Sequence, residues 1–382
     1  MPTSAGRAAR ACLVASLLGL GAIVPVASAA GARPVASAAG AGPGSRATSA
    51  ASVTAAGAGA GWIARDMSAS GALVDAESHQ PSAGDTANAI LALVAAGEGA
   101  NQVKAATNWL EHNFASYVSS SGVDNPGRLG LVILAGVAAG ADPVHFDGQA
   151  RSDDLVARLE NTEQLSGSSA GAFGTGTSLN AFYESLALLA LATVKDTGQE
   201  TRLAAAYLAS LQCADGGWEY SRVTTATACT RPNPKNYASP DTNTTALAVM
   251  AVAAVGGRFP YSAVSFFKNS QETNGSFGFF GVAGDGQQGD PDSTAYVIQA
   301  LIALRAINDK QFMRKGATPE QALERFQYGC KAPLSERGEF SYFGSPSQLA
   351  TLQAVPAAAG VALPMSPREL SVAEPRLSCG AA

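Results

Sequence analysis

One sequence module is copied along the chain, and this repetition constrains the fold more than any other feature. Residues 84–97 align without a gap on residues 127–140, and both segments are rich in Ala, Leu, Val and Gly. Comparable Ala/Leu-rich segments recur to give six copies, at 84–97, 127–140, 180–193, 241–256, 290–305 and 348–360, the last interrupted by Pro356. Repeats of this kind are typical of folds built by stacking one supersecondary unit.

A second helix is predicted before most of these segments, because bulky residues precede them at helical spacing. These residues are Trp109, Leu110 and Phe114; Leu155 and Leu159; Tyr207, Leu208 and Leu211; Phe266 and Phe267; and Phe326 and Tyr328. A helix that is apolar on every side has to be buried on every side. The sequence therefore predicts an all-α fold, an α/α toroid of about six helical hairpins, with the Ala/Leu-rich helices in an inner ring and the amphipathic helices outside.

An open superhelix is the alternative, since solenoids use the same unit. A closed ring is favoured because six units use up the chain and no polar end cap is evident. Asp85 and Asp241 start two of the copies and are predicted to cap free N–H groups of the inner helices.

The N-terminal region is predicted to be a secretory leader followed by a spacer. Arg7 and Arg10 precede an apolar run at 11–26, and small residues follow at 27–29, which is typical of a signal peptide spanning 1–29. The run is shorter than the ~20 residues of a membrane-spanning helix. Residues 30–60, mostly Ala, Gly and Ser, are predicted to be flexible. The repeat domain is expected at 61–360 and a Pro-containing tail at 361–382, in a secreted protein without a stable membrane span.

Charge and cysteine content exclude several classes of partner. A net charge of -5 gives no basic excess for binding nucleic acid. The cysteines outside the leader are Cys213, Cys229, Cys330 and Cys379. An even count in an exported protein implies disulfides, and of the three connectivities the sequence neighbours favour Cys213 with Cys229 and Cys330 with Cys379. No Cys-x-x-Cys pair is present and the histidines are scattered, so neither a metal site nor a cofactor is expected.

Two blocks resemble the QW motif of squalene and oxidosqualene cyclases. The residues that carry it are Gln212, Gly216 and Trp218 in the first block, and Gln271, Gly275 and Phe277 in the second. The run Asp-Pro-Asp-Ser-Thr-Ala at 290–295 is similar to the DxDDTA signature of class II terpene cyclases. The resemblance covers about 62–360 and implies the α/α toroid of the terpenoid cyclase and protein prenyltransferase superfamily. This superfamily also includes cobalamin carriers and complement thioester domains, so the fold alone assigns no function.

The resemblance implies different roles for these motifs. The QW residues are interpreted as structural, tying neighbouring hairpins together through stacking and capping. Asp292 stands where the cyclases have the Asp that protonates an alkene or epoxide, so Asp292 and Asp290 are the catalytic candidates. Ser293 replaces the third Asp of the signature. The alternative is that Asp290, Asp292 and Thr294 only start a helix, as Asp241 and Thr244 do.

Binding is favoured over catalysis as the function of this chain. The first hypothesis is an exported protein whose toroid mouth holds a small, largely apolar or amphipathic ligand, with Asp85, Asp241, Asp292 and Tyr296 as candidate contacts. The second is a cyclase-like enzyme, which the incomplete signature and the 7% aromatic content disfavour, because carbocations require many aromatic faces. A carbohydrate-active toroid using Glu184, Asp292 and Glu339 is third.

Overall fold

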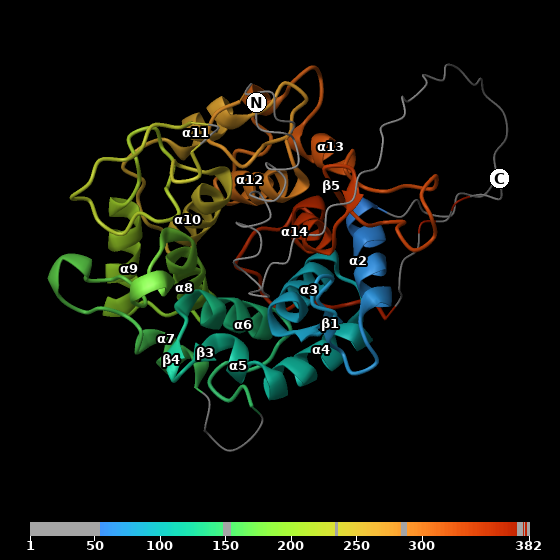
Figure 1. Ribbon diagram of the computed structural model, residues 1–382, viewed down its shortest axis with the longest axis horizontal. Helices are drawn as coiled ribbons and strands as arrows, with labels where there is room; N and C mark the ends of the chain where they lie inside the picture. Colours follow the sequence, from blue (N-terminus) through green and yellow to red (C-terminus); the bar gives the residue numbers. More distant parts are fainter. Residues whose placement is uncertain are drawn as a thin grey trace.

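A computed structural model describes residues 54–147, 154–233, 236–283, 289–372, 377 and 379. The helices form two concentric rings (Figure 1). The inner helices are α3 (Ala83–Ala96), α6 (Pro126–Ala138), α8 (Ala181–Thr193), α10 (Thr242–Ala254), α12 (Pro291–Ala303) and α14 (Gln348–Ala358). The outer helices are α2 (Ala55–Asp66), α4 (Ala100–Asn113), α7 (Leu155–Glu160), α9 (Gln199–Ser210), α11 (Ala263–Ser270) and α13 (Pro319–Glu324). The predicted all-α toroid class is confirmed.

The inner ring is closed. Its helices contact one another in the order α3, α6, α8, α10, α12 and α14, and α14 contacts α3. Small residues allow this approach: a Cβ added at Gly130 of α6 would lie 2.6 Å from the carbonyl oxygen of Leu186 in α8. The side chains of α8 and α10 are buried over almost their whole length. Burial on every side is the physical reason that these segments carry almost no charge.

The inner helices begin at polar capping residues. In each, the cap side chain accepts a hydrogen bond from the backbone N–H three residues later. These caps are Ser82, Asn125, Asn180, Asp241, Asp290 and Ser347. The predicted cap at Asp85 is therefore wrong, because the hydroxyl of Ser82 accepts from the Asp85 N–H and Asp85 itself lies in the first turn. The predicted cap at Asp241 is observed, with Thr244 donating.

The first hairpin starts earlier than residue 61. Helix α2 begins at Ala55, and its Ala/Gly composition reflects close packing: a Cβ at Gly59 would lie 2.5 Å from Cγ2 of Val355 in α14. The side-chain amide of Gln327 donates to the Ala55 carbonyl, which joins the last repeat to the first. Residues 1–53, including the predicted signal peptide and most of the predicted spacer, lie outside the described residues.

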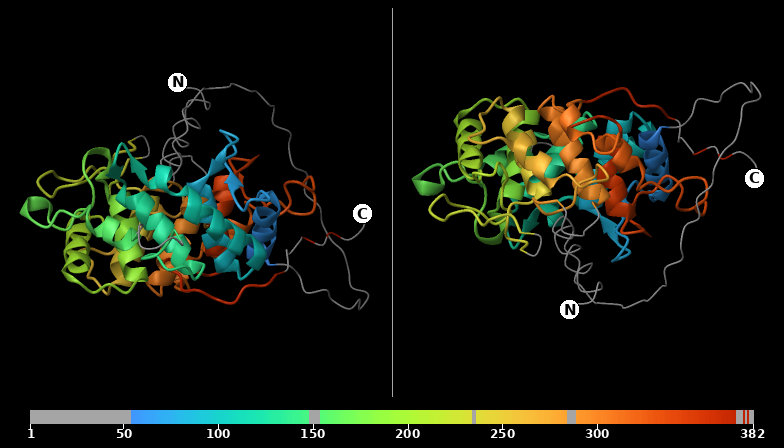
Figure 2. Two further views of the ribbon diagram at one scale, coloured as in Figure 1. Left: turned by 90° about the horizontal axis from the view of Figure 1, so that it is seen from below. Right: turned by 90° about the horizontal axis from the view of Figure 1, so that it is seen from above.

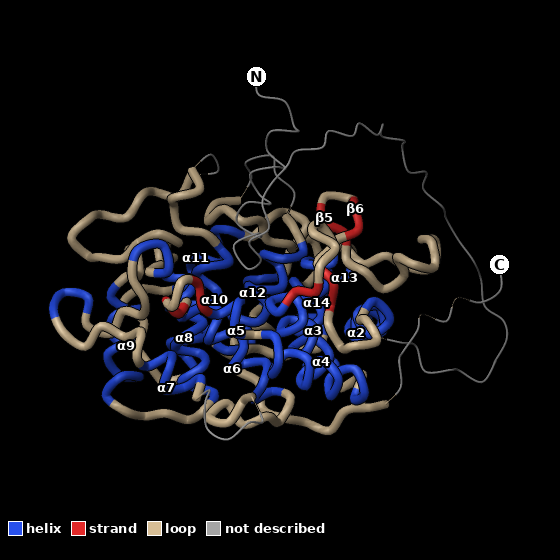
Figure 3. The backbone as a smooth tube through the Cα atoms, turned by 60° about the horizontal axis from the view of Figure 1, so that its bottom comes forward, coloured by secondary structure: helices blue, strands red, loops and turns tan. Residues whose placement is uncertain are grey.

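Short β-hairpins lead into three of the inner helices (Figure 3). They pair β1 (Leu73–Val74) with β2 (Pro81–Ser82) before α3, β3 (Ser119–Ser120) with β4 (Val123–Asp124) after the short helix α5 (Ala115–Val118), and β5 (Ser341–Tyr342) with β6 (Ser345–Pro346) before α14. The blue β1–β2 hairpin projects from one face of the ring in the side views (Figure 2). None of the helices in the described part of the chain has the length and apolarity needed to cross a bilayer.

The C-terminal tail is attached to the ring. The backbone of Ser371 bonds to Gly97 and Ala100, and the Arg368 side chain donates to the carbonyl of Ala95. Both predicted cysteine pairs lie at disulfide distance, with S–S separations of 2.01 Å for Cys213–Cys229 and 1.97 Å for Cys330–Cys379.

We expect a non-reducing peptide map of the exported protein to show these two disulfides and no others. The Cys330–Cys379 bond has a sequence separation of 49 residues, and it fixes the tail to the last hairpin in addition to the tail's attachment at Ser371. Free thiols at Cys330 and Cys379, or a peptide linking Cys229 to Cys330, would contradict this assignment.

Candidate ligand site at the mouth of the inner ring

The beginnings of the inner helices lie at one end of the ring, here called the mouth. Hydrogen bonds link three of these starts to the loop before the next inner helix. The Ala181 N–H donates to the Tyr220 carbonyl, and the Thr242 N–H donates to that of Phe279. The Gln348 side chain donates to the carbonyl of Val74. Side chains in the first turns therefore share one end of the toroid.

The QW-like blocks bridge neighbouring hairpins. The Gln212 amide donates to the carbonyls of Gly216 and Tyr261, and its oxygen accepts from the Tyr261 N–H, next to the start of α11. The Gln271 amide does the same with the carbonyls of Gly275 and Phe312. These bonds satisfy backbone groups at helix ends, which is the geometry that a structural role requires.

The aromatic residue of each block is anchored to an inner helix. The Trp218 N–H donates to Oγ1 of Thr245, and its indole N–H donates to the Leu208 carbonyl. The Phe277 N–H likewise donates to Oγ1 of Thr294. Thr294 is thus occupied by a structural contact and is not free to act on a ligand.

The structure contains a third block of this kind, which the sequence analysis did not predict. Gln327 bonds to the Gly338 carbonyl, and the Phe340 N–H donates to Thr351. Ten residues separate Gln327 from Gly338 where the other blocks have three, and this insertion hides the motif. The threonine four residues after the cap is the signal that would have found it, since Thr86, Thr245, Thr294 and Thr351 share that position.

Glu184 takes the place of this threonine in α8. Its Oε2 accepts from the Phe173 N–H at 2.8 Å, the bond that a threonine hydroxyl accepts elsewhere. Burial raises the pKa of Glu184 well above its usual value, although the Phe173 hydrogen bond opposes this. Glu184 therefore has the structural role in α8 that the threonine has in the other repeats.

The glycosidase-like set is not assembled. Glu184 has Glu163 as its charged neighbour, Glu339 has Asp66 and Glu336, and Asp292 has Asp290. The electrostatic neighbours of these three carboxyl groups thus differ, and none of the three is among the principal charged neighbours of another.

Helix α12 carries a polar stripe on an otherwise apolar inner helix. Asp292, Tyr296 and Gln299 lie at spacings of four and three residues, so they share one helix face. Their exposed fractions are 6%, 9% and 3%. Oδ1 of Asp292 and Oε1 of Gln299 have no hydrogen-bond partner among the described residues. Buried polar atoms without partners carry a free-energy cost, and a ligand is one way to satisfy them.

The two aspartates at the start of α12 have different surroundings. Asp290 is the cap, and both of its oxygens accept from Ser293, one from the N–H and one from the hydroxyl. Asp292 has no such donors. Burial, together with the nearby charge of Asp290, raises the pKa of Asp292 well above the ordinary value. The protonated form of Asp292, which can donate a hydrogen bond, is therefore favoured more strongly than in an ordinary aspartate.

Aromatic rings face the α12 stripe across the inner ring. The Phe182 ring of α8 lies 6.4 Å from Tyr296, 6.3 Å from Tyr183 and 6.2 Å from Tyr220, measured between ring centroids. Helices α8 and α12 are both neighbours of α10, so the Phe182–Tyr296 contact crosses the inside of the ring. The mouth therefore combines apolar aromatic faces with buried polar atoms of α12 that have no partner among the described residues.

The other predicted contacts are distributed around the mouth. Asp241 caps α10, is 1% exposed, and leaves Oδ2 without a partner in the described part of the chain. Burial raises the pKa of Asp241 to about 7. Asp85 lies on α3, and its charged neighbours are Asp75 and Glu77. Gln299 was not predicted, although a Gln seven residues after Asp292 in an Ala/Leu-rich helix is a visible signal.

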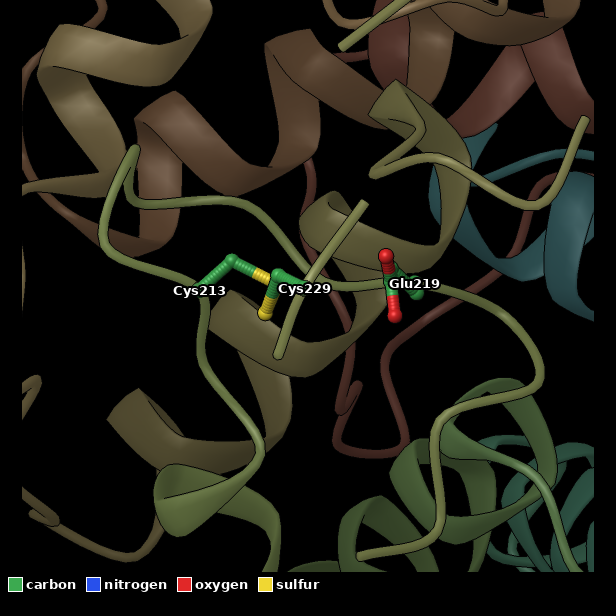
Figure 4. A group of neighbouring side chains, drawn as sticks. All are labelled: Cys213, Glu219 and Cys229. Atoms are coloured by element: carbon green, nitrogen blue, oxygen red, sulfur yellow. A yellow bond between two sulfur atoms is a disulfide. The ribbon is translucent and has the colours of Figure 1, made fainter. Parts of the chain in front are cut away.

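One grouping of potential metal ligands occurs among the described residues, namely Cys213, Glu219 and Cys229. Figure 4 shows the two sulfur atoms bonded to each other beside the Glu219 carboxylate. A disulfide offers no thiolate, and Oε1 of Glu219 already accepts from the Thr230 N–H. This grouping is part of a disulfide-closed loop and does not fit a metal ion.

Comparisons with known proteins place the fold. No protein family matches the sequence, and no curated protein matches it either. An alpha-amylase from Clostridium perfringens superposes with a TM-score of 0.56 at 12% identity, covering 82% of this chain and 99% of that one. A type II terpene cyclase from Scytonema, in complex with the product merosterolic acid A, superposes with a TM-score of 0.51 at 13% identity, covering 80% and 95%. Candida albicans protein geranylgeranyltransferase-I complexed with GGPP gives 0.46 at 10% identity, covering 71% and 82%.

The first two likenesses confirm the α/α-toroid resemblance at the level of the fold. Their sequence identities are too low to carry a function to this chain. Its function has to be argued from the side chains at the mouth.

Proposed function

We propose that this chain is an exported protein that binds a small, largely apolar ligand at the mouth of the inner ring. The observation that carries the proposal is the α12 stripe, in which Asp292 and Gln299 keep buried oxygens without partners opposite the Phe182 ring. A pocket that is mostly apolar with a few converging polar groups is typical of small-molecule sites. The two disulfides and the N-terminal signal pattern support export.

The chemistry of the stripe defines the polar part of the ligand. A neutral Asp292 carboxyl donates a hydrogen bond, so it fits an acceptor such as a carbonyl, ether or hydroxyl oxygen. The Gln299 oxygen accepts, so a ligand hydroxyl or N–H fits beside it. A carboxylate or phosphate is disfavoured because α12 has no basic side chain that could pair with an anion.

Protein purified from its own culture medium tests the proposal. We expect native mass spectrometry to show a stoichiometric adduct that organic solvent extracts, and we expect the stripped protein to rebind it. Asp292→Leu should weaken rebinding about tenfold, the loss of roughly one hydrogen bond, while thermal stability is kept because the cap at Asp290 is untouched. Asp309→Asn, an exposed position beyond the C-terminal end of α12, is the control and should rebind normally. Unchanged rebinding by Asp292→Leu would remove the mouth as the site.

A cyclase-like reaction is the second candidate, and one observation favours it. Asp292 is a buried acid whose raised pKa favours the protonated form, and the rings of Tyr296 and Phe182 lie nearby, as proton transfer to an alkene requires. Against it, the Ser293 hydroxyl donates to Asp290, and Oδ1 of Asp292 has no hydrogen-bond partner in the described part of the chain to orient the carboxyl group. Cyclised products from squalene or a linear diphosphate, lost in Asp292→Asn, would establish the enzyme in place of the binding protein.

A further inference from the structure

A second pocket lies outside the inner ring, between the β1–β2 hairpin, the end of α4, α5 and the start of α6. Its volume is about 530 Å³, within the range of small-ligand pockets. Residues of several chemical kinds line it, including Trp109, Tyr117, Arg128, Asp75, Ser82 and Asn113. Figure 1 shows α4 and α5 along the outside of α3 and α6, away from α12.

Arg128 is held in place but keeps donors to spare. Its Nη1 donates to the Tyr117 carbonyl at 3.0 Å, and the guanidinium lies 5.1 Å from the centroid of the Tyr117 ring. Nε is buried and has no partner among the described residues. A guanidinium has five N–H donors, so most of this group's capacity remains open to a ligand.

Carboxyl groups balance the charge of Arg128. Asp75 lines the pocket, and its Oδ1 accepts from the Ser78 N–H at 2.6 Å. Asp85 lies next to Asp75, and burial, followed by the charge of Asp75, raises its pKa to about 6. Asp75 and Arg128 both line the pocket, so the site has an acceptor and donors of opposite charge.

Aromatic surface completes the site. Trp109 is half-buried on α4, and the Tyr117 ring lies beneath the Arg128 guanidinium. Sugars present one apolar C–H face, which stacks on aromatic rings, and a rim of hydroxyls that both donate and accept. An anion would be repelled by Asp75, and a cation by Arg128.

We propose that this pocket binds a neutral saccharide, stacked on Trp109 and hydrogen-bonded by Arg128 and Asp75. The site is separate from the α12 stripe, so a test of saccharide binding here is independent of the ligand proposed for the mouth. It also gives Asp85 a role beside Asp75, where the sequence prediction had placed Asp85 among contacts to the mouth ligand.

Calorimetric titration of the folded protein with maltotriose, cellotriose and N,N′,N″-triacetylchitotriose tests the inference. We expect at least one of them to bind with a Kd below about 1 mM, and Trp109→Ala to weaken it at least about tenfold. Tyr261→Ala removes an exposed aromatic side chain elsewhere on the surface and should bind as wild type. Arg128→Gln provides a second variant that keeps the aromatic wall and should also weaken binding, and circular dichroism melts verify that each variant is folded.

Two results would overturn the inference. The first is the absence of heat with all three trisaccharides, or binding that Trp109→Ala and Arg128→Gln leave intact. The second is binding of galacturonate with no binding of the neutral sugars, because the pocket would then select an anion through Arg128.

Discussion

Replacing Gly216 by alanine is expected to lower the free energy of unfolding by about 4 kcal/mol, combining backbone strain with overpacking. Gly216 has a φ of +94°, and a Cβ there would lie 2.2 Å from the Ser262 carbonyl oxygen. That carbonyl belongs to the start of α11, the helix that Gln212 ties to the preceding hairpin. The substitution therefore pushes two hairpins apart where their backbones approach closely.

Gly140→Ala is the matched control. Its φ is +84°, and no atom lies within 4 Å of a Cβ built at that position. Alanine there carries the backbone strain alone, so we expect a loss of about 1 kcal/mol. Chemical denaturation of both variants measures the difference. Equal losses would show that the close approach to α11 contributes nothing.

The inner ring could be predicted from the sequence because its signal is local and repeated. Each inner helix has a run of Ala, Leu and Val, and the predicted bounds of α3 and α12 agree with the observed ones within two residues at each end. Disulfide pairing followed from sequence proximity and the even cysteine count. Ring closure was predicted from the number of helical hairpins. In the structure, the hydrogen bond from Gln327 to the Ala55 carbonyl joins the last hairpin to the first.

Other features depend on contacts that no local pattern encodes. The Ala/Gly run at the start of α2 looks like a spacer, and only its packing against Val355 makes small residues necessary there. Asp85 looks like a cap, but Ser82 three residues earlier takes that place. The Phe182–Tyr296 contact exists only once the ring has closed, so the aromatic side of the mouth could not be read from either helix alone.

Asp241→Asn is expected to stabilise the protein at pH 8 by about 2 to 4 kcal/mol while changing little at pH 4. Burial raises the pKa of Asp241 in the folded protein to about 7, from an ordinary value of 3.8. Between pH 3.8 and about 7, Asp241 is mostly protonated in the folded protein and mostly ionised in the unfolded chain. Stability from this group is thus complete below about pH 4 and is lost as the pH rises through 7. Asparagine does not titrate, and its side-chain oxygen still accepts the Thr244 N–H as a cap.

Asn180→Asp provides the reverse experiment on the neighbouring inner helix. Asn180 caps α8 and is 4% exposed, so an aspartate there meets the same burial as Asp241. We expect this variant to become less stable than wild type as the pH rises from 4 to 8, while Asp241→Asn becomes more stable than wild type over the same range. Denaturation at several pH values separates the two trends. Parallel curves for both variants would mean that the buried caps are solvated well enough to ionise freely, and the neutral state argued for Asp292 on the same physical grounds would then lose its basis.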